Sequence, residues 1–236
     1  MPRAEAKCRD RPAQTPPPAM NTTIDTQVFI SLINGDPEQA IQQKQANAVL
    51  AKLAENSDVV WVIHKNQLKE LLAKTREIVS GGELRGEDQE NAEEFLNYLA
   101  GLELELTLGT ASGKRILYGD PDADDSATTR KATKAVELAE ALLKENPSGW
   151  ENERTDAIIV CHAMLEKAIL LSSDKKHVAP MVEKLNELQN ETFPPPWLKG
   201  LREFKRFPFL KDPKDLHFKR PEKKKPQEVL EALSLG

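Results

Sequence analysis

The stretch of sequence that decides the fold is Ile24-Asp25-Thr26-Gln27-Val28-Phe29-Ile30-Ser31-Leu32-Ile33-Asn34-Gly35-Asp36-Pro37. Its first part is apolar and β-prone, which predicts a strand that passes into a helical turn. Its last part, Gly35-Asp36-Pro37, predicts the start of a helix, with Asp at the N-cap and Pro at the first helical position. The apolar part contains one carboxylate, Asp25. At the carboxyl end of a first parallel strand, this acid would lie where open α/β sheets gather their functional groups.

The composition is that of a globular protein without a membrane span. The chain has 236 residues, of which 39% are hydrophobic and 30% charged, enough for one sizeable domain with extensions. No apolar run reaches the roughly 18–20 residues that a membrane span needs, and residues 1–20 lack the apolar segment of a secretory signal. The two cysteines, Cys8 and Cys161, form neither a disulfide framework nor a zinc motif, which fits a reducing compartment. We therefore expect a cytoplasmic protein that has no membrane partner.

Charge and proline content set both ends of the chain apart from its middle. Residues 1–20 are polar and proline-rich and are expected to form a disordered leader, which is not native if Met20 is the true start. Residues 20–192 hold 18 Lys and Arg against 30 Asp and Glu, a net charge of −12. Residues 193–225 carry 11 basic and 4 acidic residues, a net charge of +7, within a basic, proline-rich extension over residues 191–236. Such an extension either contacts a polyanion, folds back on the acidic body or stays solvated and disordered.

Residues 21–190 are expected to form one α/β domain on a mostly parallel sheet, because strand-like and helix-like periods alternate along them. After the first strand, the expected strands cover 59–63, 102–108, 116–118 and 168–174. The expected helices cover 37–56, 68–79, 83–101, 128–145, 155–165 and 181–189. The strict Leu-Glu alternation of residues 102–108 predicts a strand with one solvent-exposed face, with which 116–118 would pair.

Four carboxylates fall at comparable places in this pattern. Asp25 and Asp174 stand at strand ends. Glu70 lies early in a helix that follows a strand, and Asp156 lies in the first turn of an apolar helix. In a parallel sheet with right-handed crossovers, all of these places lie on one edge. Carboxylates brought together repel one another unless some are protonated or a cation neutralises them. Mg²⁺ and Mn²⁺ prefer carboxylate and water oxygens, activate water and stabilise charge on a phosphodiester, so the pattern favours a metal-dependent phosphodiesterase site.

Each acid alone also has a structural explanation. Asp156 could interact with a helix dipole, Glu70 could be solvated and Asp174 could belong to a turn, so only their order and spacing together favour a site. A further acidic segment, Asp120-Pro121-Asp122-Ala123-Asp124-Asp125, resembles a calcium loop only in part. An EF-hand loop needs Gly at its sixth position and Glu at its twelfth, where this chain has Asp and Lys. We expect this segment to be a charge cluster ahead of a helix.

The order of the four acids resembles that of the PIN-domain family of metal-dependent nucleases, over about residues 22–188. The most specific motifs are Ile24-Asp25-Thr26-Gln27-Val28-Phe29-Ile30 at the start, and Thr155-Asp156-Ala157-Ile158-Ile159 with Leu170-Leu171-Ser172-Ser173-Asp174 at the end. The stretch Ile63-His64-Lys65-Asn66-Gln67-Leu68-Lys69-Glu70-Leu71 is similar to the middle block of the family, where a strand is followed by a helix that bears an acid.

The resemblance implies a three-layer α/β/α sandwich and an endoribonuclease whose catalytic Mg²⁺ or Mn²⁺ is held by Asp25, Glu70, Asp156 and Asp174. Thr26 and Ser173 would support neighbouring acids through their hydroxyl groups. Family members are often the toxin of a toxin–antitoxin pair, so RNA is the expected substrate, and an antitoxin protein and a second copy of the chain are the expected partners. The chain departs from the family in two ways: Gln27 replaces the usual Asn, and the segment between the second and third acids is long for a compact toxin.

The alternative is a PIN-like scaffold without catalytic activity that binds RNA or a protein through the basic extension. Aromatic residues there interleave with basic ones, a combination that suits phosphate contact and base stacking, and the basic residues concerned are Lys199, Arg202, Lys205 and Arg206. The aromatic residues are equally compatible with packing back onto the domain. The presence of all four acids favours the enzyme. Other enzyme classes find no support, because zinc-type histidine spacing, a glycine-rich phosphate loop and a Ser or Cys nucleophile motif are missing from the sequence.

Overall fold

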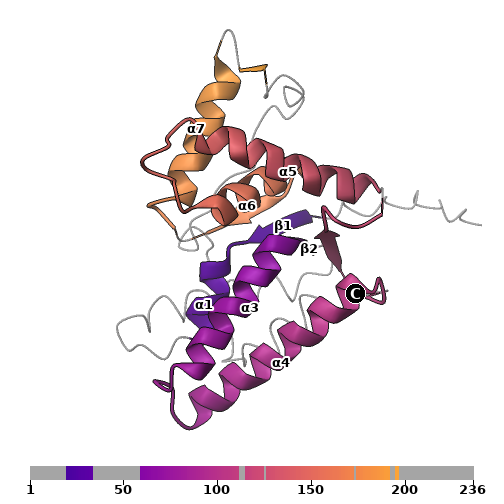
Figure 1. The fold of residues 1–236 in the computed structure, drawn as a ribbon, viewed down its shortest axis with the longest axis vertical. Coiled ribbons are helices and arrows are strands. Elements are labelled where there is room, and N and C mark those ends of the chain that lie inside the picture. The colour runs from indigo at the N-terminus through magenta and orange to yellow at the C-terminus, as the bar shows by residue number, and fades with distance from the viewer. Residues whose placement is uncertain are drawn as a thin grey trace, which may run out of the picture.

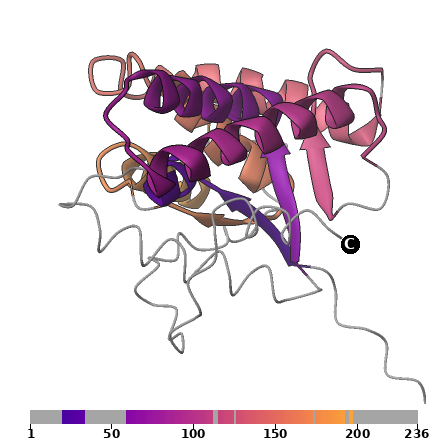
Figure 2. The same cartoon turned by 90° about the horizontal axis from the view of Figure 1, so that it is seen from below.

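A four-stranded parallel sheet forms the centre of the domain. The computed structural model describes residues 20–33, 59–111, 115–124, 126–172, 174–191 and 195–196. Its strands are β1 (Met20–Ile24), β2 (Val59–His64), β3 (Ile116–Gly119) and β4 (Ile169–Leu171). They lie in the order β3-β2-β1-β4, and every neighbouring pair is parallel. Figure 2 shows β2 and β3 side by side and pointing the same way.

Helices cover both faces of this sheet, which gives the three layers of an α/β/α sandwich (Figure 1). One face carries α1 (Thr26–Ile33), α3 (Lys65–Ser80) and α4 (Glu87–Thr107). The opposite face carries α5 (Ala127–Leu143), α6 (Arg154–Leu165) and α7 (Val178–Asn190). Two separate apolar cores result, one on each side of the sheet. The α/β class and the layered architecture predicted from the sequence are therefore confirmed.

Strand β2 shows why a continuous apolar run forms a doubly covered sheet. Successive side chains point to opposite faces of a strand. Trp61 and Ile63 accordingly enter the core beneath α3 and α4, while Val62 enters the core beneath α5 and α6. All three are fully buried, and burying a side chain of this kind contributes roughly 1.5–3 kcal/mol. The ring of Phe29 on α1 packs on Trp61 with centroids 5.3 Å apart, which ties the first helix to the second strand.

The order of the strands creates a switch point between β1 and β4. The chain moves outward from β1 to β2 and β3 with its crossover helices on one face. It then returns to the other side of β1 through α5 and α6 on the opposite face. This reversal keeps the crossovers right-handed. In open α/β sheets, the crevice outside the carboxyl ends of the two strands at such a reversal is where ligands bind.

The predicted strand over residues 102–108 is wrong, because α4 continues through Thr107. Leucine and glutamate are both strong helix formers, so their alternation does not exclude a helix. In the helix, Leu102 extends the buried face begun by Phe95 and Leu99, whereas Leu104 is left 60% exposed. The pairing expected for residues 116–118 is wrong for the same reason: β3 pairs with β2 instead.

The strand predicted at the start of the opening stretch ends at Ile24, and the β-prone residues after Asp25 form helix α1, whose Val28, Phe29 and Ile33 pack into the core. The strand predicted over 168–174 covers only Ile169–Leu171, and the remaining helices and strands within the described residues are found with ends shifted by a few residues. Helix α3, for example, ends at Ser80 with Gly81 as its C-cap, where the Gly-Gly pair predicts a stop. Among the described helices, none has the length and apolar character needed to cross a membrane. The predicted leader, the helix predicted after Pro37 and the basic residues of the extension (Lys199, Arg202, Lys205 and Arg206) lie outside the described residues.

Candidate metal centre

A cleft of about 590 Å³ lies at the carboxyl ends of β1 and β4, the switch point of the sheet. All four acids singled out from the sequence line it, although they come from four separate segments of the chain. The residues that line the cleft are Asp25, Gln27, Glu70, Lys74, Asn152, Glu153, Thr155, Asp156, Asp174, Lys175, Lys176 and His177. The cleft is thus a mixed site in which acids predominate and a few basic side chains stand beside them.

Asp25 is the most deeply buried acid of the cleft, with 3% of its surface exposed. Its backbone N–H donates to the carbonyl of Leu171 at 2.8 Å, which holds it in line with the β1–β4 ladder. Its Oδ2 accepts a hydrogen bond from Ser172 Oγ at 2.5 Å, and its Oδ1 accepts one from the Gln27 N–H at 3.4 Å. Burial raises the pKa of Asp25 to about 6 despite these hydrogen bonds, and the carboxylates of Asp174 and Glu70 add to the rise.

Ser172 joins the acids of β1 and β4. Its hydroxyl donates to Asp25 and accepts from the backbone N–H of Asp174 at 3.0 Å. Sequence reasoning assigned this supporting role to the neighbouring Ser173, which lies outside the described residues. The two serines differ by one position just beyond a strand end, where the alternation of side chains no longer predicts which of them faces the acid.

Glu70 is positioned by the helix that follows β2. One turn earlier on α3, Gln67 donates from Nε2 to the carbonyl of Ile24 at 2.5 Å, which anchors the helix to the end of β1. Glu70 Oε2 accepts from Thr26 Oγ1 at 3.4 Å, so the hydroxyl of Thr26 contacts one of the four acids. Glu70 Oε1 pairs with Lys74 Nζ at 2.5 Å, one turn further along α3. Burial lowers the pKa of Lys74, but the hydrogen bond and charge of Glu70 outweigh this and raise it.

Asp156 has the most strongly shifted pKa among the acids of the cleft. It lies in the first turn of α6 and is partly buried. Burial raises its pKa to about 8, and the negative charges of Asp25, Glu70, Glu153 and Asp174 contribute to the rise. Without a cation this carboxyl group therefore holds a proton at neutral pH.

The side chain of Asp174 accepts hydrogen bonds from the residues that lead into α7. Its Oδ1 accepts from the backbone N–H of Lys176 at 2.7 Å and of His177 at 2.9 Å, and its Oδ2 lies 3.1 Å from His177 Nδ1. Burial alone would raise the pKa of Asp174, but these hydrogen bonds hold it below its usual value. His177 Nε2 lies on the opposite side of the ring, 3.6 Å from Glu153 Oε1.

Several residues of the cleft were not predicted, among them Lys74, Glu153 and His177. A sequence signal exists for the first two, because side chains three or four positions apart on one helix face are neighbours. Lys74 follows Glu70 by four residues, and Glu153 precedes Asp156 by three. That spacing becomes informative only once the acids themselves have been identified.

The donor set of the cleft fits a hard divalent cation. Carboxylate oxygens are what Mg²⁺ and Mn²⁺ prefer, and Asp25, Glu70, Asp156 and Asp174 line one cleft. Among the described residues, however, no three of these four acids bring their oxygens within 4.8 Å of one another, so an ion would have to draw them together. Burial is the main cause of the raised pKa values of Asp25 and Asp156, and the neighbouring carboxylates add to it. Lys74 pairs with one carboxylate oxygen of Glu70, and the other oxygen accepts a hydrogen bond from Thr26. Asp25, Glu70, Asp156 and Asp174 are the residues that would hold such an ion.

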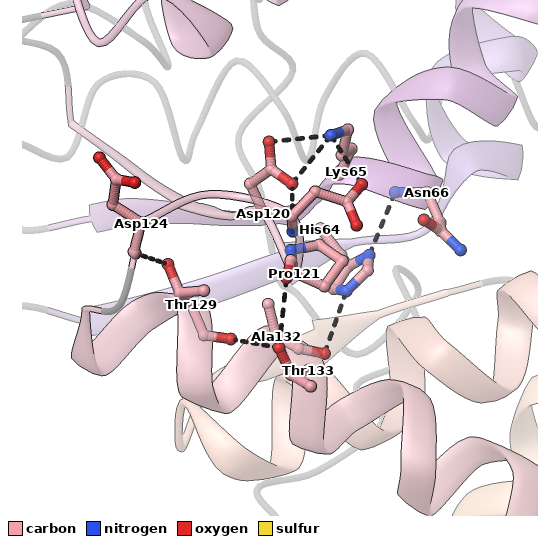
Figure 3. A network of polar contacts seen from close by, with 10 residues as sticks. His64, Lys65, Asn66, Asp120, Pro121, Asp124, Thr129, Ala132 and Thr133 are labelled. Carbon is pink, nitrogen blue, oxygen red and sulfur yellow. Dashed lines mark hydrogen bonds and ion pairs between the residues drawn. The ribbon is translucent and has the colours of Figure 1, made fainter.

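A second acidic segment, between β3 and α5, has a different environment (Figure 3). Lys65, the first residue of α3, donates from Nζ to both carboxylate oxygens of Asp120 at 2.9 and 3.0 Å, and to Asp122 at 3.0 Å. Asp122 also donates from its backbone N–H to Asp120 at 2.9 Å. Ser126 caps α5 by accepting from the Thr129 N–H at 3.0 Å. This segment is a neutralised charge cluster ahead of a helix, in keeping with the prediction.

Comparison with models of protein families, with curated proteins and with solved structures gave no match to this chain. What the fold and the cleft define is an α/β protein with a carboxylate-rich cleft at the switch point of a parallel sheet. The resemblance to the PIN-domain family therefore rests on the sequence motifs.

Proposed function

We propose that this chain is a metal-dependent endoribonuclease of the PIN-domain type. One observation carries the proposal: carboxylates from four separate segments of the chain line a single cleft at the switch point of the sheet. Four acids in one cleft repel one another unless some are protonated, paired with a basic side chain or neutralised by a bound cation. Glu70 is paired with Lys74, whereas Asp25 and Asp156 have raised pKa values and, within the described part of the chain, no basic partner at hydrogen-bond distance. The order of the four acids along the chain is that of the PIN-domain motifs.

Each side chain of the cleft has a part in this proposal. Asp25, Glu70, Asp156 and Asp174 hold Mg²⁺ or Mn²⁺, which when bound supplies a Lewis acid that activates water and neutralises charge on a phosphodiester. Ser172 orients Asp25 through its 2.5 Å hydrogen bond, and Thr26 orients Glu70. Such supporting contacts tune a metal site nearly as much as the ligands themselves.

The basic side chains of the cleft support a polyanionic substrate. Lys74, Lys175 and Lys176 line the cleft beside the acids, where they can contact phosphate oxygens on either side of a scissile bond. Lys74 is paired with Glu70 in this structure. A metal ion bound to Glu70 would weaken that ion pair, so the ammonium group of Lys74 could contact the substrate instead. The basic extension, with Lys199, Arg202, Lys205 and Arg206, would add further phosphate contacts.

The proposal extends to the setting of the protein. A cytoplasmic location fits the cysteine content and the absence of a membrane span among the described helices. Toxin activity in a toxin–antitoxin pair would add an antitoxin protein as a partner, and light scattering of the purified chain would show whether a second copy binds.

Cleavage of labelled single-stranded RNA by the purified full chain tests the function. Reactions contain Mg²⁺, Mn²⁺ or EDTA and compare the wild type with Asp25→Asn and with Asp122→Asn, a matched loss of one carboxylate outside the cleft. We expect metal-dependent cleavage that Asp25→Asn abolishes and Asp122→Asn preserves. A DNA strand of the same sequence in parallel reactions shows whether the sugar matters.

Two outcomes would overturn the proposal. RNA cleavage that persists in EDTA and in Asp25→Asn would mean that a contaminant, or another part of the chain, is responsible for the activity. RNA binding without cleavage, unaffected by Asp25→Asn but weakened by deletion of residues 193–236, would establish the scaffold alternative.

A further inference from the structure

Three side chains at one end of the cleft bring together a mixed set of nitrogen and oxygen donors. Glu153 is the residue before α6, Asp156 lies in the first turn of that helix, and His177 is the residue before α7. One donor atom from each lies within 4.8 Å of the other two. All three side chains are partly buried and line the cleft, so their donor atoms are confined and still open to solvent ions.

The orientation of the His177 ring is set by a carboxylate that is not part of this set. Asp174 Oδ2 lies 3.1 Å from His177 Nδ1, and Asp174 itself is held by the backbone N–H groups of Lys176 and His177. An ionised carboxylate only accepts hydrogen bonds, so Nδ1 carries the proton of this contact. Nε2 is then the nitrogen directed at Glu153. Histidines that bind metals characteristically donate their other ring nitrogen to a carboxylate in this way.

The spacing of the donors suits a shared ion better than a direct contact. His177 Nε2 and Glu153 Oε1 are 3.6 Å apart, which is too long for a hydrogen bond. Two ligands that each lie about 2.1 Å from one ion are separated by roughly 3.0–3.4 Å at the usual coordination angles. Movement of either side chain by a few tenths of an ångström would therefore place both within reach of one ion.

We propose that Glu153, Asp156 and His177 form a binding site for a divalent transition-metal ion. An imidazole ligand favours ions such as Co²⁺, Zn²⁺ or Fe²⁺, whereas Mg²⁺ prefers oxygen ligands and binds imidazole poorly. The site is thus selective in a way that the all-carboxylate set around Asp25 is not. It does not depend on the nuclease proposal. If that proposal holds, the shared Asp156 makes this site the second position of a two-metal centre.

Metal binding to the full-length chain, without RNA, tests the site. The probes are Co²⁺ and Mg²⁺, and calorimetry measures the binding of each ion. The visible absorption of bound Co²⁺ responds to the ligands around it and reports whether a nitrogen is among them. His177→Asn keeps a side-chain donor near Asp174 but lacks Nε2. Glu153→Gln removes the facing charge, and Glu151→Gln removes the same charge from an exposed position two residues away. Thermal unfolding of each variant verifies the fold.

We expect His177→Asn and Glu153→Gln to lower Co²⁺ affinity about 10–100-fold, as loss of such groups does in metal sites, and to bleach the nitrogen-ligated absorption. Glu151→Gln should match the wild type, and Mg²⁺ affinity should change less than about twofold in His177→Asn, because Mg²⁺ makes little use of imidazole. Unchanged Co²⁺ binding in both cleft variants, or an equal loss of Co²⁺ and Mg²⁺, would overturn the proposal. Co²⁺ binding that only Asp25→Asn disrupts would refute this site while leaving the nuclease proposal intact.

Discussion

Two groups of acids lie at the carboxyl edge of the same sheet, and their surroundings differ. After β3, Asp120 and Asp122 share the ammonium group of Lys65, which donates to both within 3.0 Å. The hydrogen bond and charge of Lys65 lower the pKa of Asp122. In the cleft after β1 and β4, burial and neighbouring acids raise the pKa of Asp25 and Asp156 instead. The comparison teaches that the number of acids does not identify a cation site: what matters is whether burial leaves individual carboxylates without a basic partner, as it does for Asp25 and Asp156 among the residues that the structure describes.

His64 and Asp156 should respond to pH with opposite signs, and the effect of His64 should be the larger of the two. This histidine ends β2 beside the neutralised cluster, accepts from the Asn66 N–H at Nδ1 and lies 3.3 Å from the Ala132 carbonyl at Nε2 (Figure 3). Burial lowers its pKa to about 4, although the contact with Ala132 opposes this. An unfolded histidine takes up a proton below about pH 6.5, so the free energy of unfolding falls as the pH drops from 6.5 to 4. The slope is about 1.4 kcal/mol per pH unit, or about 3 kcal/mol in all.

Urea unfolding of the wild type and of His64→Asn between pH 4 and 7 measures this effect. Asparagine keeps an acceptor for the Asn66 N–H but does not titrate. The free energy of unfolding of the variant should therefore rise relative to that of the wild type as the pH falls. Parallel stability curves for the two proteins would contradict the expectation.

In the cleft, removing an acid should stabilise the metal-free protein. The pKa of Asp156 is raised to about 8, so the folded state holds a proton that the unfolded state releases near pH 4. The free energy of unfolding therefore falls as the pH rises through this window. In EDTA at pH 7, Asp156→Asn should raise it by about 2 kcal/mol, after allowance for the partial exposure of the side chain.

Asp122→Asn is the matched control for that prediction, because its carboxylate is exposed and paired with Lys65. Denaturant unfolding should show little change in this variant. A destabilised Asp156→Asn would mean that the cleft acids are already satisfied without a cation, and the contrast between the two regions would disappear.

A single hydroxyl should matter more for metal binding in the cleft than its size suggests. Ser172→Ala removes the donor to Asp25 Oδ2 and the acceptor for the Asp174 N–H. Mg²⁺ affinity measured by calorimetry should fall about 10-fold or more, because supporting groups of this kind orient metal ligands. Ser126→Ala removes the cap of α5 near the other cluster and should cost about 1 kcal/mol of stability while leaving Mg²⁺ affinity unchanged. Equal Mg²⁺ affinity in Ser172→Ala and wild type would show that Asp25 is not a ligand.

The smallest expected effect is the replacement of Lys65 by glutamine. The pair with Asp122 is at the surface, where Asp122 is 76% exposed, and such ion pairs contribute about 1 kcal/mol or less. The pair with Asp120 is mostly buried, but glutamine keeps an amide N–H that can donate to that carboxylate. Lys65→Gln should therefore lower the free energy of unfolding by about 1 kcal/mol in a thermal or urea experiment. A loss of several kcal/mol would mean that Lys65 has a larger structural part than neutralising this loop.

The sequence predicted the scaffold of the site because its signals are local. The β-branched run of β2 specifies a buried strand, and the helix that carries Asp156 is buried from Ala157 to Leu165. The strand before Asp25 has no such signal, because Met20–Ile24 is largely polar and the apolar run after Asp25 forms helix α1. Parallel pairing then brings the strand ends to one edge, which is why the four acids could be grouped before the structure was known. The Leu-Glu repeat of residues 102–108 failed as a strand because its two residue types also favour helices, and tertiary packing decided between them.

The details of the site depend on loop geometry that periodicity does not encode. Ser172, just beyond the end of β4, donates a hydrogen bond to Asp25. His177, the residue before α7, lies beside Glu153, the residue before α6. The pairing of Lys65 with the acidic loop joins residues 55 positions apart. Such contacts follow from how the strand ends are arranged in space, so they become visible only in the folded structure.

The central claim is that Asp156 holds a proton at neutral pH until a cation in the cleft replaces it, and the most direct test counts that proton. Calorimetric titration of Mg²⁺ into the wild-type chain at pH 7, repeated in two buffers of different ionisation enthalpy, gives the number released per ion bound. With Asp156 near 8 and Asp25 near 6 in pKa, we expect about one proton per ion at pH 7, fewer at pH 9, and greatly weakened binding in Asp25→Asn. Mg²⁺ binding without proton release at pH 7, or binding that Asp25→Asn leaves unchanged, would contradict the account.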